Sequence, residues 1–221
     1  MSISLPTPNI AHLTEEDYEH VYEPAAEDSF ILLDALELDA QLVRDDQPLI
    51  CVEIGSGSGI ASTFLSQLVG SSSSLVISTD INRYACGVTL RTAQANEISL
   101  NPILCHLLDP LFNRLKNNID ILVFNPPYVP TGMTELMDTQ NQRDIGGAWA
   151  GGQDGMIITD VILDKLPELL SPIGKMYLVT VIQNKPLEIM RKMESKGLVC
   201  KEIIKRRAGR ELLSVLRISR T

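Results

Sequence analysis

The tetrapeptide Asn-Pro-Pro-Tyr at positions 125–128 contains residue types that could bind a ligand or take part in catalysis. It follows an apolar, β-branched run at 119–124, interrupted only by Asp120, which is typical of a buried parallel strand. Two successive prolines fix φ and remove two backbone donors, so the backbone after Asn125 is stiff and its carbonyls stay free. A polar amide, rigid acceptors and an aromatic ring thus stand at a strand end, where open α/β sheets bind ligands. The alternative is a turn that merely ends the strand.

A glycine-rich turn at 53–59 is the second candidate site, between a predicted strand at 49–54 and a helical pattern beginning at Ile60. Its glycines, which let a ligand approach the backbone closely, are Gly55, Gly57 and Gly59. The spacing is not the Gly-x-Gly-x-x-Gly dinucleotide fingerprint, and no phosphate-binding lysine follows. Glu53 would repel a pyrophosphate but attract the cationic end of an amino acid. The turn therefore favours S-adenosylmethionine over NAD.

A second acid, Asp80, stands at the tip of the next predicted strand, residues 75–79. An acid at this place is suited to accept hydrogen bonds from ribose hydroxyls. The alternative role is to cap the helix predicted over about 82–96. Because Glu53 and Asp80 recur at consecutive strand tips, we favour the ribose contact.

The surrounding periodicity alternates strands and helices, as an α/β fold requires. Further strands are predicted over residues 102–107, 175–182, 198–204 and 212–218. Further helices are predicted over residues 30–38, 156–170 and 185–196, the first capped by Asp28 or Ser29. The last two strands flank a basic turn at 206–210 and form a hairpin. Residues 1–17 lack periodicity and are expected to be a flexible lead-in, so the folded domain is expected to span 18–221.

Composition narrows the function classes. The 221 residues suit one domain, and the net charge of −9 opposes phosphate backbones, which argues against direct nucleic-acid binding. The chain has only three histidines and four scattered cysteines, so we expect neither a metal site nor a disulfide framework. No apolar stretch reaches bilayer-spanning length and no signal pattern begins the chain, so no membrane partner is expected. We expect a soluble cytoplasmic protein, with the nucleus as a second compartment.

The tetrapeptide resembles the Asn-Pro-Pro-Tyr signature of S-adenosylmethionine-dependent methyltransferases that act on a planar amide or exocyclic amine. Over residues 18–219 the chain is similar to HemK-type glutamine methyltransferases, and most similar to the eukaryotic and archaeal branch that modifies the class 1 translation termination factor. The resemblance implies a class I, Rossmann-like fold, in which a seven-stranded, mostly parallel sheet carries helices on both faces and a C-terminal antiparallel hairpin. It implies methyl transfer to N5 of the glutamine in the factor's Gly-Gly-Gln motif.

The resemblance also assigns roles to the site residues. The Asn125 side-chain oxygen and the Pro126 carbonyl would accept the hydrogens of the substrate amide, beside the cofactor. Pro127 would keep the corner stiff, and Tyr128 would pack against the planar amide. Ser29, in the segment Tyr-Glu-Pro-Ala-Ala-Glu-Asp-Ser at 22–29, stands where a hydroxyl contacts the cofactor.

The third strand departs from the family pattern. Relatives place an aspartate before the leucine there, to bind the adenine amino group, whereas this chain has His106-Leu107 with Asp109 following. His106 through a ring nitrogen, or Leu107 through its backbone, is a candidate adenine contact. The alternatives are that Asp109 turns in, or that His106 only caps the strand.

Two further features follow from the resemblance. Relatives of this branch work with a small zinc-binding activator protein, which implies a heterodimer. The activator could dock on an exposed apolar edge near the third strand. Its candidate residues are Ile98, Leu100, Ile103 and Leu104, and the alternative is that they belong to the ordinary core. Gly-Gly-Gln at 151–153 spells the substrate motif of the family, and we interpret this as coincidence, with Trp149 as a packing anchor beside the site.

Three alternative functions stay open. Planar NH2 groups occur on adenine as well as glutamine, so an adenine-N6 methyltransferase acting on nucleic acid is one. A protein lysine methyltransferase is the second, and a cofactor-binding scaffold without activity is the third.

Overall fold

The apolar run before the tetrapeptide forms β4 (Ile119–Phe124), in which every residue is buried. Ile121 and Val123 join one hydrophobic cluster and Leu122 and Phe124 the other, because successive side chains point to opposite faces of the sheet. Asp120, the one charge in the strand, accepts hydrogen bonds from the backbone N–H groups of residues 49 and 50 and from the hydroxyl of residue 171. It thereby ties together three neighbouring strands.

The computed structural model describes residues 5–21, 26–70, 72–129 and 151–220. In these ranges seven strands form one sheet in the order β3-β2-β1-β4-β5-β7-β6. The strands besides β4 are β1 (Ile50–Ile54), β2 (Leu75–Asp80), β3 (Asn101–Leu104), β5 (Leu170–Val181), β6 (Val199–Ala208) and β7 (Glu211–Ser219). The first five are parallel, and β7 runs antiparallel to both β5 and β6.

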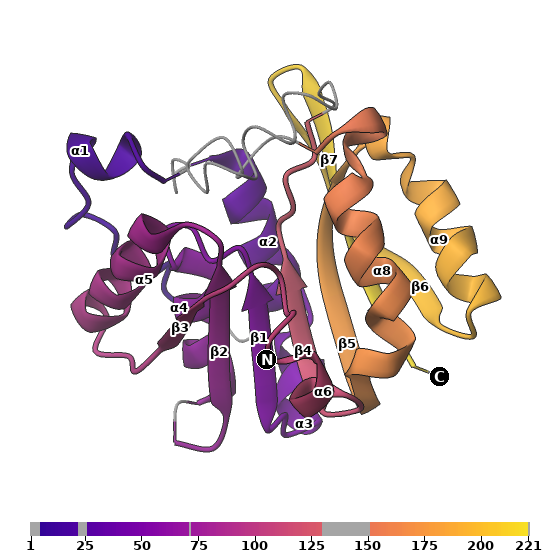
Figure 1. Ribbon diagram of the computed structural model, residues 1–221, viewed down its shortest axis with the longest axis horizontal. Helices are drawn as coiled ribbons and strands as arrows, with labels where there is room; N and C mark the ends of the chain where they lie inside the picture. Colours follow the sequence, from indigo (N-terminus) through magenta and orange to yellow (C-terminus); the bar gives the residue numbers. More distant parts are fainter. Residues whose placement is uncertain (1–4, 22–25, 71, 130–150, 221) are drawn as a thin grey trace.

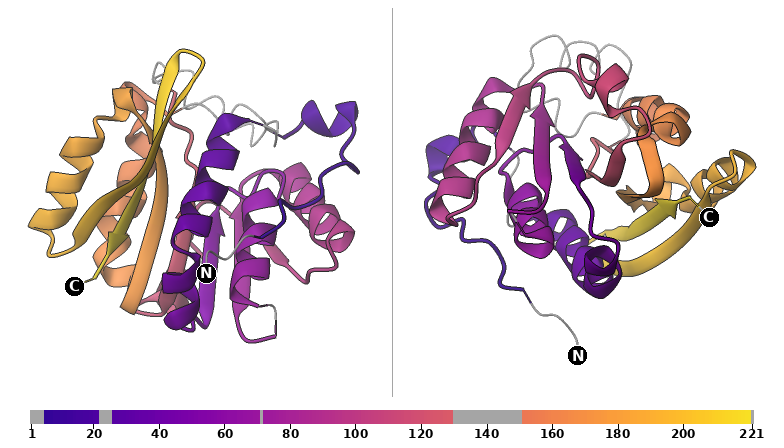
Figure 2. Two further views of the ribbon diagram at one scale, coloured as in Figure 1. Left: turned by 180° about the vertical axis from the view of Figure 1, so that it is seen from behind. Right: turned by 90° about the horizontal axis from the view of Figure 1, so that it is seen from below.

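Helices cover both faces of the sheet, as Figures 1 and 2 show. On one side lie α2 (Glu27–Leu38), α3 (Ala40–Asp45), α4 (Ile60–Val69) and α5 (Arg83–Ala95). On the other lie α6 (Phe112–Leu115), α8 (Ile157–Leu169) and α9 (Pro186–Ser195). The short elements are α1 (Glu15–Tyr18), η2 (Gln153–Gly155) and η3 (Ile182–Asn184). The predicted seven-stranded, mostly parallel sheet with its closing antiparallel hairpin is confirmed.

Several boundaries differ from the prediction. The third strand ends at Leu104 rather than at residue 107, and β5 begins at Leu170 rather than at residue 175. Helix α2 begins at Glu27 after Ala26, whose side chain makes no capping bond, so the capping role predicted for Asp28 or Ser29 is wrong.

The predicted lead-in, residues 1–17, is described from residue 5 onward. It contains the start of α1, whose first turn is capped by a capping box between Thr14 and Asp17, and it contacts α5 and Asn96 beyond the end of that helix. Trp149, predicted to be a packing anchor, and residues 22–25 lie outside the described residues. Among the described helices none is long and apolar enough to cross a membrane.

Candidate functional site

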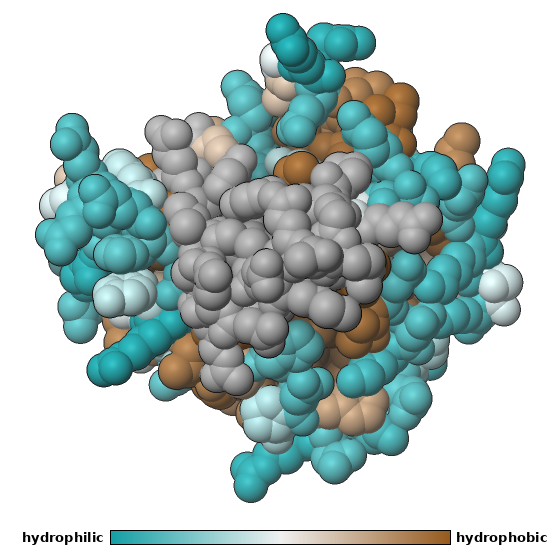
Figure 3. All heavy atoms as spheres, turned by 45° about the horizontal axis from the view of Figure 1, so that its top comes forward, coloured by the Kyte–Doolittle hydropathy of each residue, from teal (hydrophilic) through white to brown (hydrophobic). Residues whose placement is uncertain are grey.

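A cavity of about 200 Å³ lies where β1, β2 and β4 end. These strand ends lie toward the top of Figure 1, and in Figure 3, which brings that side forward, the coloured surface is mostly hydrophilic with smaller apolar patches. Nearly all the residues selected from the sequence line this one cavity: Ser29, Glu53, Gly55, Gly57, Asp80, His106, Leu107, Asn125, Pro126, Pro127 and Tyr128. Residues as far apart in the chain as 29 and 128 thus meet at one place.

Gly59 is the exception among the predicted site residues, because it does not line the cavity. It precedes α4 with φ 79°, and a Cβ there would stand 2.7 Å from the Cα of Thr89 on α5. Glycine is therefore required for the close packing of two helices. The first part of the turn is held differently, since the N–H groups of Gly55 and Ser56 both donate to the carbonyl of Thr79.

The two acids at the strand tips lie near the glycine turn, Glu53 buried and Asp80 partly buried. Glu53 is 3% exposed and accepts a hydrogen bond from the Ser62 hydroxyl, and burial raises its pKa to about 8. Asp80 accepts from the N–H of Gly57 (2.9 Å) and from the N–H of Asn82 (2.8 Å). Burial also raises the pKa of Asp80, although these N–H groups oppose the effect. The alternative role considered for Asp80 was to cap the following helix. That helix, α5, is capped by Asn82 instead, whose side chain accepts a hydrogen bond from the N–H of residue 84.

The Asn-Pro-Pro-Tyr corner is held by a residue that sequence reasoning did not place in the site. The Asn125 amide nitrogen donates to Asp28 Oδ2 at 3.2 Å, and the Tyr128 hydroxyl donates to the same oxygen at 2.9 Å. Asp28 is 4% exposed and lies on α2. The Asn125 side-chain oxygen is buried and has no hydrogen-bond partner among the described residues. In the sequence, the signal that could have identified Asp28 was its position in the segment 22–29, next to Ser29.

The segment after the undescribed residues packs against the same corner. Gly151 N–H donates to the carbonyl of Val129 at 2.9 Å, and Asn184 donates from its side chain to the carbonyl of Tyr128 at 3.2 Å. A Cβ on Gly151 would stand 2.3 Å from the Pro127 carbonyl oxygen. Packing against the corner thus accounts for glycine at 151, which supports the interpretation of Gly-Gly-Gln at 151–153 as coincidence.

The departure at the third strand places His106 and Leu107 on the cavity wall but not Asp109. Asp109 pairs with a ring nitrogen of His106 at 2.8 Å and lies 3.8 Å from Lys165. Leu107 has φ 47°, a left-handed conformation uncommon for a leucine, in the turn that ends the strand. This geometry favours His106 or Leu107 over Asp109 as the adenine contact.

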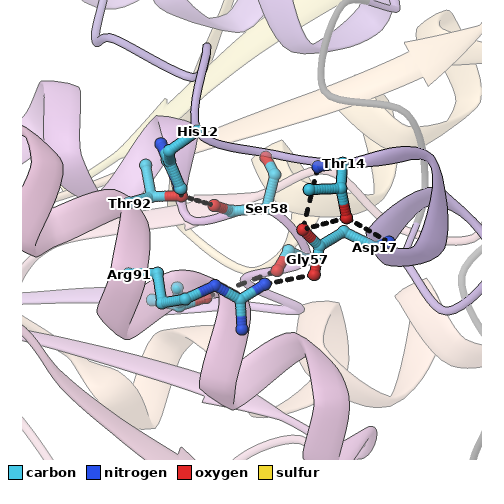
Figure 4. Close-up of polar contacts among 8 residues, drawn as sticks. His12, Thr14, Asp17, Gly57, Ser58, Arg91 and Thr92 are labelled. Atoms are coloured by element: carbon cyan, nitrogen blue, oxygen red, sulfur yellow. Dashed lines mark hydrogen bonds and ion pairs between the residues drawn. The ribbon is translucent and has the colours of Figure 1, made fainter.

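An N-terminal strap, residues 9–21, lies against α5, and Figure 4 shows its polar contacts there. Arg91 pairs with Asp17, and the His12 ring lies 3.2 Å from the hydroxyl of Thr92, which in turn donates to the Ser58 carbonyl at 2.6 Å. The strap ends at the cavity, where residues 20 and 21 join the lining. The strap therefore joins α5, which in turn bonds to the glycine turn, to one part of the cavity lining.

A scan against protein-family models finds no match for the chain. Individual proteins do match along nearly its whole length. It is 44% identical to the mouse methyltransferase HEMK2, covering 99% of this chain and 98% of the relative. It is 40% identical to the eRF1 methyltransferase catalytic subunit mtq2 of Schizosaccharomyces pombe (98% and 96%), and 28% identical to a putative protein N5-glutamine methyltransferase of Methanocaldococcus jannaschii (81% and 82%).

Solved structures share the fold. The Mtq2-Trm112 complex of E. cuniculi, described as responsible for methylation of the eRF1 translation termination factor, contains a chain with a TM-score of 0.63 and 24% identity, covering 91% of this chain and 99% of that one. The 16S rRNA methyltransferase RsmC of T. thermophilus, solved with AdoMet and guanosine, gives a TM-score of 0.60 at 17% identity, covering 91% of this chain and 45% of that one.

Proposed function

The chain belongs to the family of HemK-type methyltransferases that includes HEMK2 and the catalytic subunit of eRF1 methyltransferase, and on that premise we propose its reaction. It transfers a methyl group from S-adenosylmethionine to N5, the side-chain amide nitrogen of the glutamine in the Gly-Gly-Gln motif of the class 1 termination factor. The observation that carries the proposal is the buried oxygen of Asn125 on the cavity wall, which has no hydrogen-bond partner in the described part of the chain. A buried acceptor without a partner costs about 1–3 kcal/mol, so a substrate N–H is its natural complement.

The cavity suits a cationic cofactor. Its described lining contains neither lysine nor arginine. It does contain four carboxylic acids, which are Asp28, Glu53, Asp80 and Glu211. A phosphate-bearing dinucleotide would lack a cationic partner there, whereas a sulfonium and an ammonium are attracted. Glu53 would hold the ammonium end, Asp80 the ribose hydroxyls, and His106 or Leu107 the adenine edge. Ser29 and the turn at Gly55 and Gly57 would complete the cofactor contacts.

S-Adenosylmethionine supplies an electrophilic methyl group, and the protein supplies alignment and charge. The glutamine amide nitrogen is a weak nucleophile because its lone pair is delocalised into the carbonyl. The Asn125 side-chain oxygen and the Pro126 carbonyl would accept its two hydrogens, so that the lone pair faces the methyl group. The same two acceptors stabilise the positive charge that grows on nitrogen as the C–N bond forms. Tyr128 would pack against the flat amide, and the proton leaves after transfer, so no general base is needed before it.

We further propose that a small zinc-binding activator protein completes the enzyme as a heterodimer partner. β3 is an edge strand of the sheet, and Leu104 on it is 50% exposed, so the backbone and an apolar side chain are both open to a partner. Leu100, offered as part of the same edge, is instead buried in the core. The partner proposal fails if the chain produced alone is monodisperse and fully active.

A protein that modifies the termination factor has its substrate in the cytoplasm, and we propose that compartment, with the nucleus as a second one. The folded methyltransferase domain is proposed to span residues 18–221. Fluorescence microscopy of a C-terminally tagged chain tests the compartment.

The deciding experiment incubates the chain, with and without the activator, with purified termination factor and methyl-labelled cofactor. Label on the Gly-Gly-Gln glutamine, absent when that glutamine is replaced by asparagine, supports the proposal. Offering DNA and RNA oligonucleotides and lysine-containing peptides in parallel tests the alternative substrates. Absence of label on the factor when the activator is present refutes the proposed function.

A further inference from the structure

Asp28 was counted above only as one of the acids that line the cavity, although it contacts two members of the Asn-Pro-Pro-Tyr corner. Its Oδ2 atom accepts hydrogen bonds from both the Asn125 amide nitrogen (3.2 Å) and the Tyr128 hydroxyl (2.9 Å). The partners are about a hundred positions away in the chain, so the contact exists only in the folded protein. One buried oxygen thus joins helix α2 to the corner.

The chemistry of this contact decides which way the Asn125 amide faces. The oxygen and nitrogen ends of an asparagine side chain have nearly the same shape, so packing alone does not distinguish the two orientations. A carboxylate is an acceptor only, and it therefore accepts the NH2 end and repels the oxygen end. With its nitrogen on Asp28, Asn125 must turn its oxygen elsewhere. That oxygen is the buried atom without a partner among the described residues.

A structural role alone does not explain Asp28. It is not the cap of α2, since the helix begins one residue earlier and Ala26 precedes it. No lysine or arginine lines the described cavity wall to neutralise its charge. The pKa of Glu211, at the start of β7, is raised first by burial and then by the charge of Asp28. A buried carboxylate among acids is costly, so its presence calls for a function.

We propose that Asp28 is a positioning residue that orients the Asn125 amide, so that the Asn125 oxygen rather than its NH2 group faces the substrate nitrogen. The same carboxylate holds the Tyr128 hydroxyl and thereby fixes the ring beside the substrate amide. In this assignment Asp28 acts through Asn125 and Tyr128 and touches neither substrate nor cofactor. The proposal rests on the proposed function, because it names what prepares the acceptor for that reaction.

The test replaces Asp28 with asparagine, which keeps the size but both donates and accepts, so that either orientation of Asn125 becomes possible. Asp34→Asn is the matched control, because Asp34 lies on the same helix and pairs with Arg206, away from the cavity lining. The assay measures kcat and KM for the termination factor, with cofactor affinity measured separately by calorimetry. For Asp28→Asn we expect kcat to fall on the order of 10- to 100-fold while KM and cofactor affinity change by less than about threefold. Asp34→Asn should behave as the unaltered chain.

A second measurement is independent of turnover. In 15N-labelled protein, the side-chain amide protons of Asn125, assigned by their loss in Asn125→Ala, should shift upfield in Asp28→Asn and stay in place in Asp34→Asn. If Asp28→Asn does not fold, Asp28→Glu takes its place. It keeps the acceptor and the charge, and should retain part of the activity together with the amide shift.

An Asp28→Asn variant that folds and keeps full kcat overturns the inference. So does a loss that appears equally as weakened cofactor binding, because Asp28 would then serve the cofactor. If the unaltered chain and Asp34→Asn both fail to methylate the Gly-Gly-Gln glutamine, the proposed function is what fails. The amide shifts then still decide whether Asp28 orients Asn125.

Discussion

Replacing Glu53 with glutamine should change how stability depends on pH in the cofactor-free protein. Glu53 is 3% exposed, and burial raises its pKa from 4.5 to about 8. The folded protein therefore binds this proton more tightly than the unfolded chain does. The contribution of Glu53 to stability is most favourable below pH 4.5 and is lost as the pH rises through about 8. At about 1.4 kcal/mol for each unit of pKa difference, the full loss is on the order of 5 kcal/mol.

Glutamine keeps the shape of the protonated acid and does not titrate. Urea denaturation between pH 5 and pH 8.5 should show the free energy of unfolding of Glu53→Gln rising above that of the unaltered chain as the pH increases. We expect a difference of at least about 2 kcal/mol at pH 8 and little difference at pH 5. Glu194→Gln, at an exposed acid on α9, is the control and should follow the unaltered chain throughout.

The same proton links Glu53 to the cofactor. A cationic amino-acid end favours the ionised carboxylate, so cofactor binding to the unaltered chain should strengthen as the pH rises toward 8, by at most about tenfold per pH unit. This dependence should vanish in Glu53→Gln, together with the binding energy of the contact. Parallel stability curves for the unaltered chain and Glu53→Gln from pH 5 to 8.5 would refute the reasoning.

Three shorter predictions follow from the site. Asn125→Ala should lower kcat by at least about 100-fold in the methylation assay while calorimetry shows cofactor affinity within a few-fold of the original; persistent transfer would contradict its role. Gly155→Ala should lower the free energy of unfolding in urea by about 3 kcal/mol, because its Cβ would stand 1.9 Å from the Tyr128 carbonyl oxygen. Gly197→Ala is the control: it has open space around it and should lower the same free energy by only about 1 kcal/mol. Asn96→Ala removes two hydrogen bonds that hold the N-terminal strap at 2.7 and 2.8 Å, so stopped-flow measurements should show several-fold faster cofactor release, and an unchanged rate would separate the strap from cofactor retention.

The sequence predicted the sheet and most of the cavity wall because both depend on local signals. The strand that ends at Phe124 is an apolar run cut off by two prolines, and the first strand ends in a glycine turn. Each signal lies within a few residues of the feature that it predicts. The antiparallel hairpin at the C-terminus was visible for the same reason, as two strand patterns around a basic turn.

Where prediction failed, the deciding interaction came from elsewhere in the chain. The third strand was expected to reach residue 107 because Leu107 continues the apolar pattern, but the backbone turns there into a left-handed conformation. Gly59 was assigned to the cofactor, yet Thr89 on another helix explains it. Asp28 was interpreted as a helix cap, because its partners in the corner are about a hundred residues distant. Local propensity carries no information about such contacts.

The hydrogen bond from Gly151 to the carbonyl of Val129 joins the chain on either side of residues 130–150. The corner is thereby tied to the segment that begins at residue 151. A side chain at position 151 would meet the Pro127 carbonyl oxygen, so this contact requires glycine, and a substitution there would displace the corner relative to the cofactor turn.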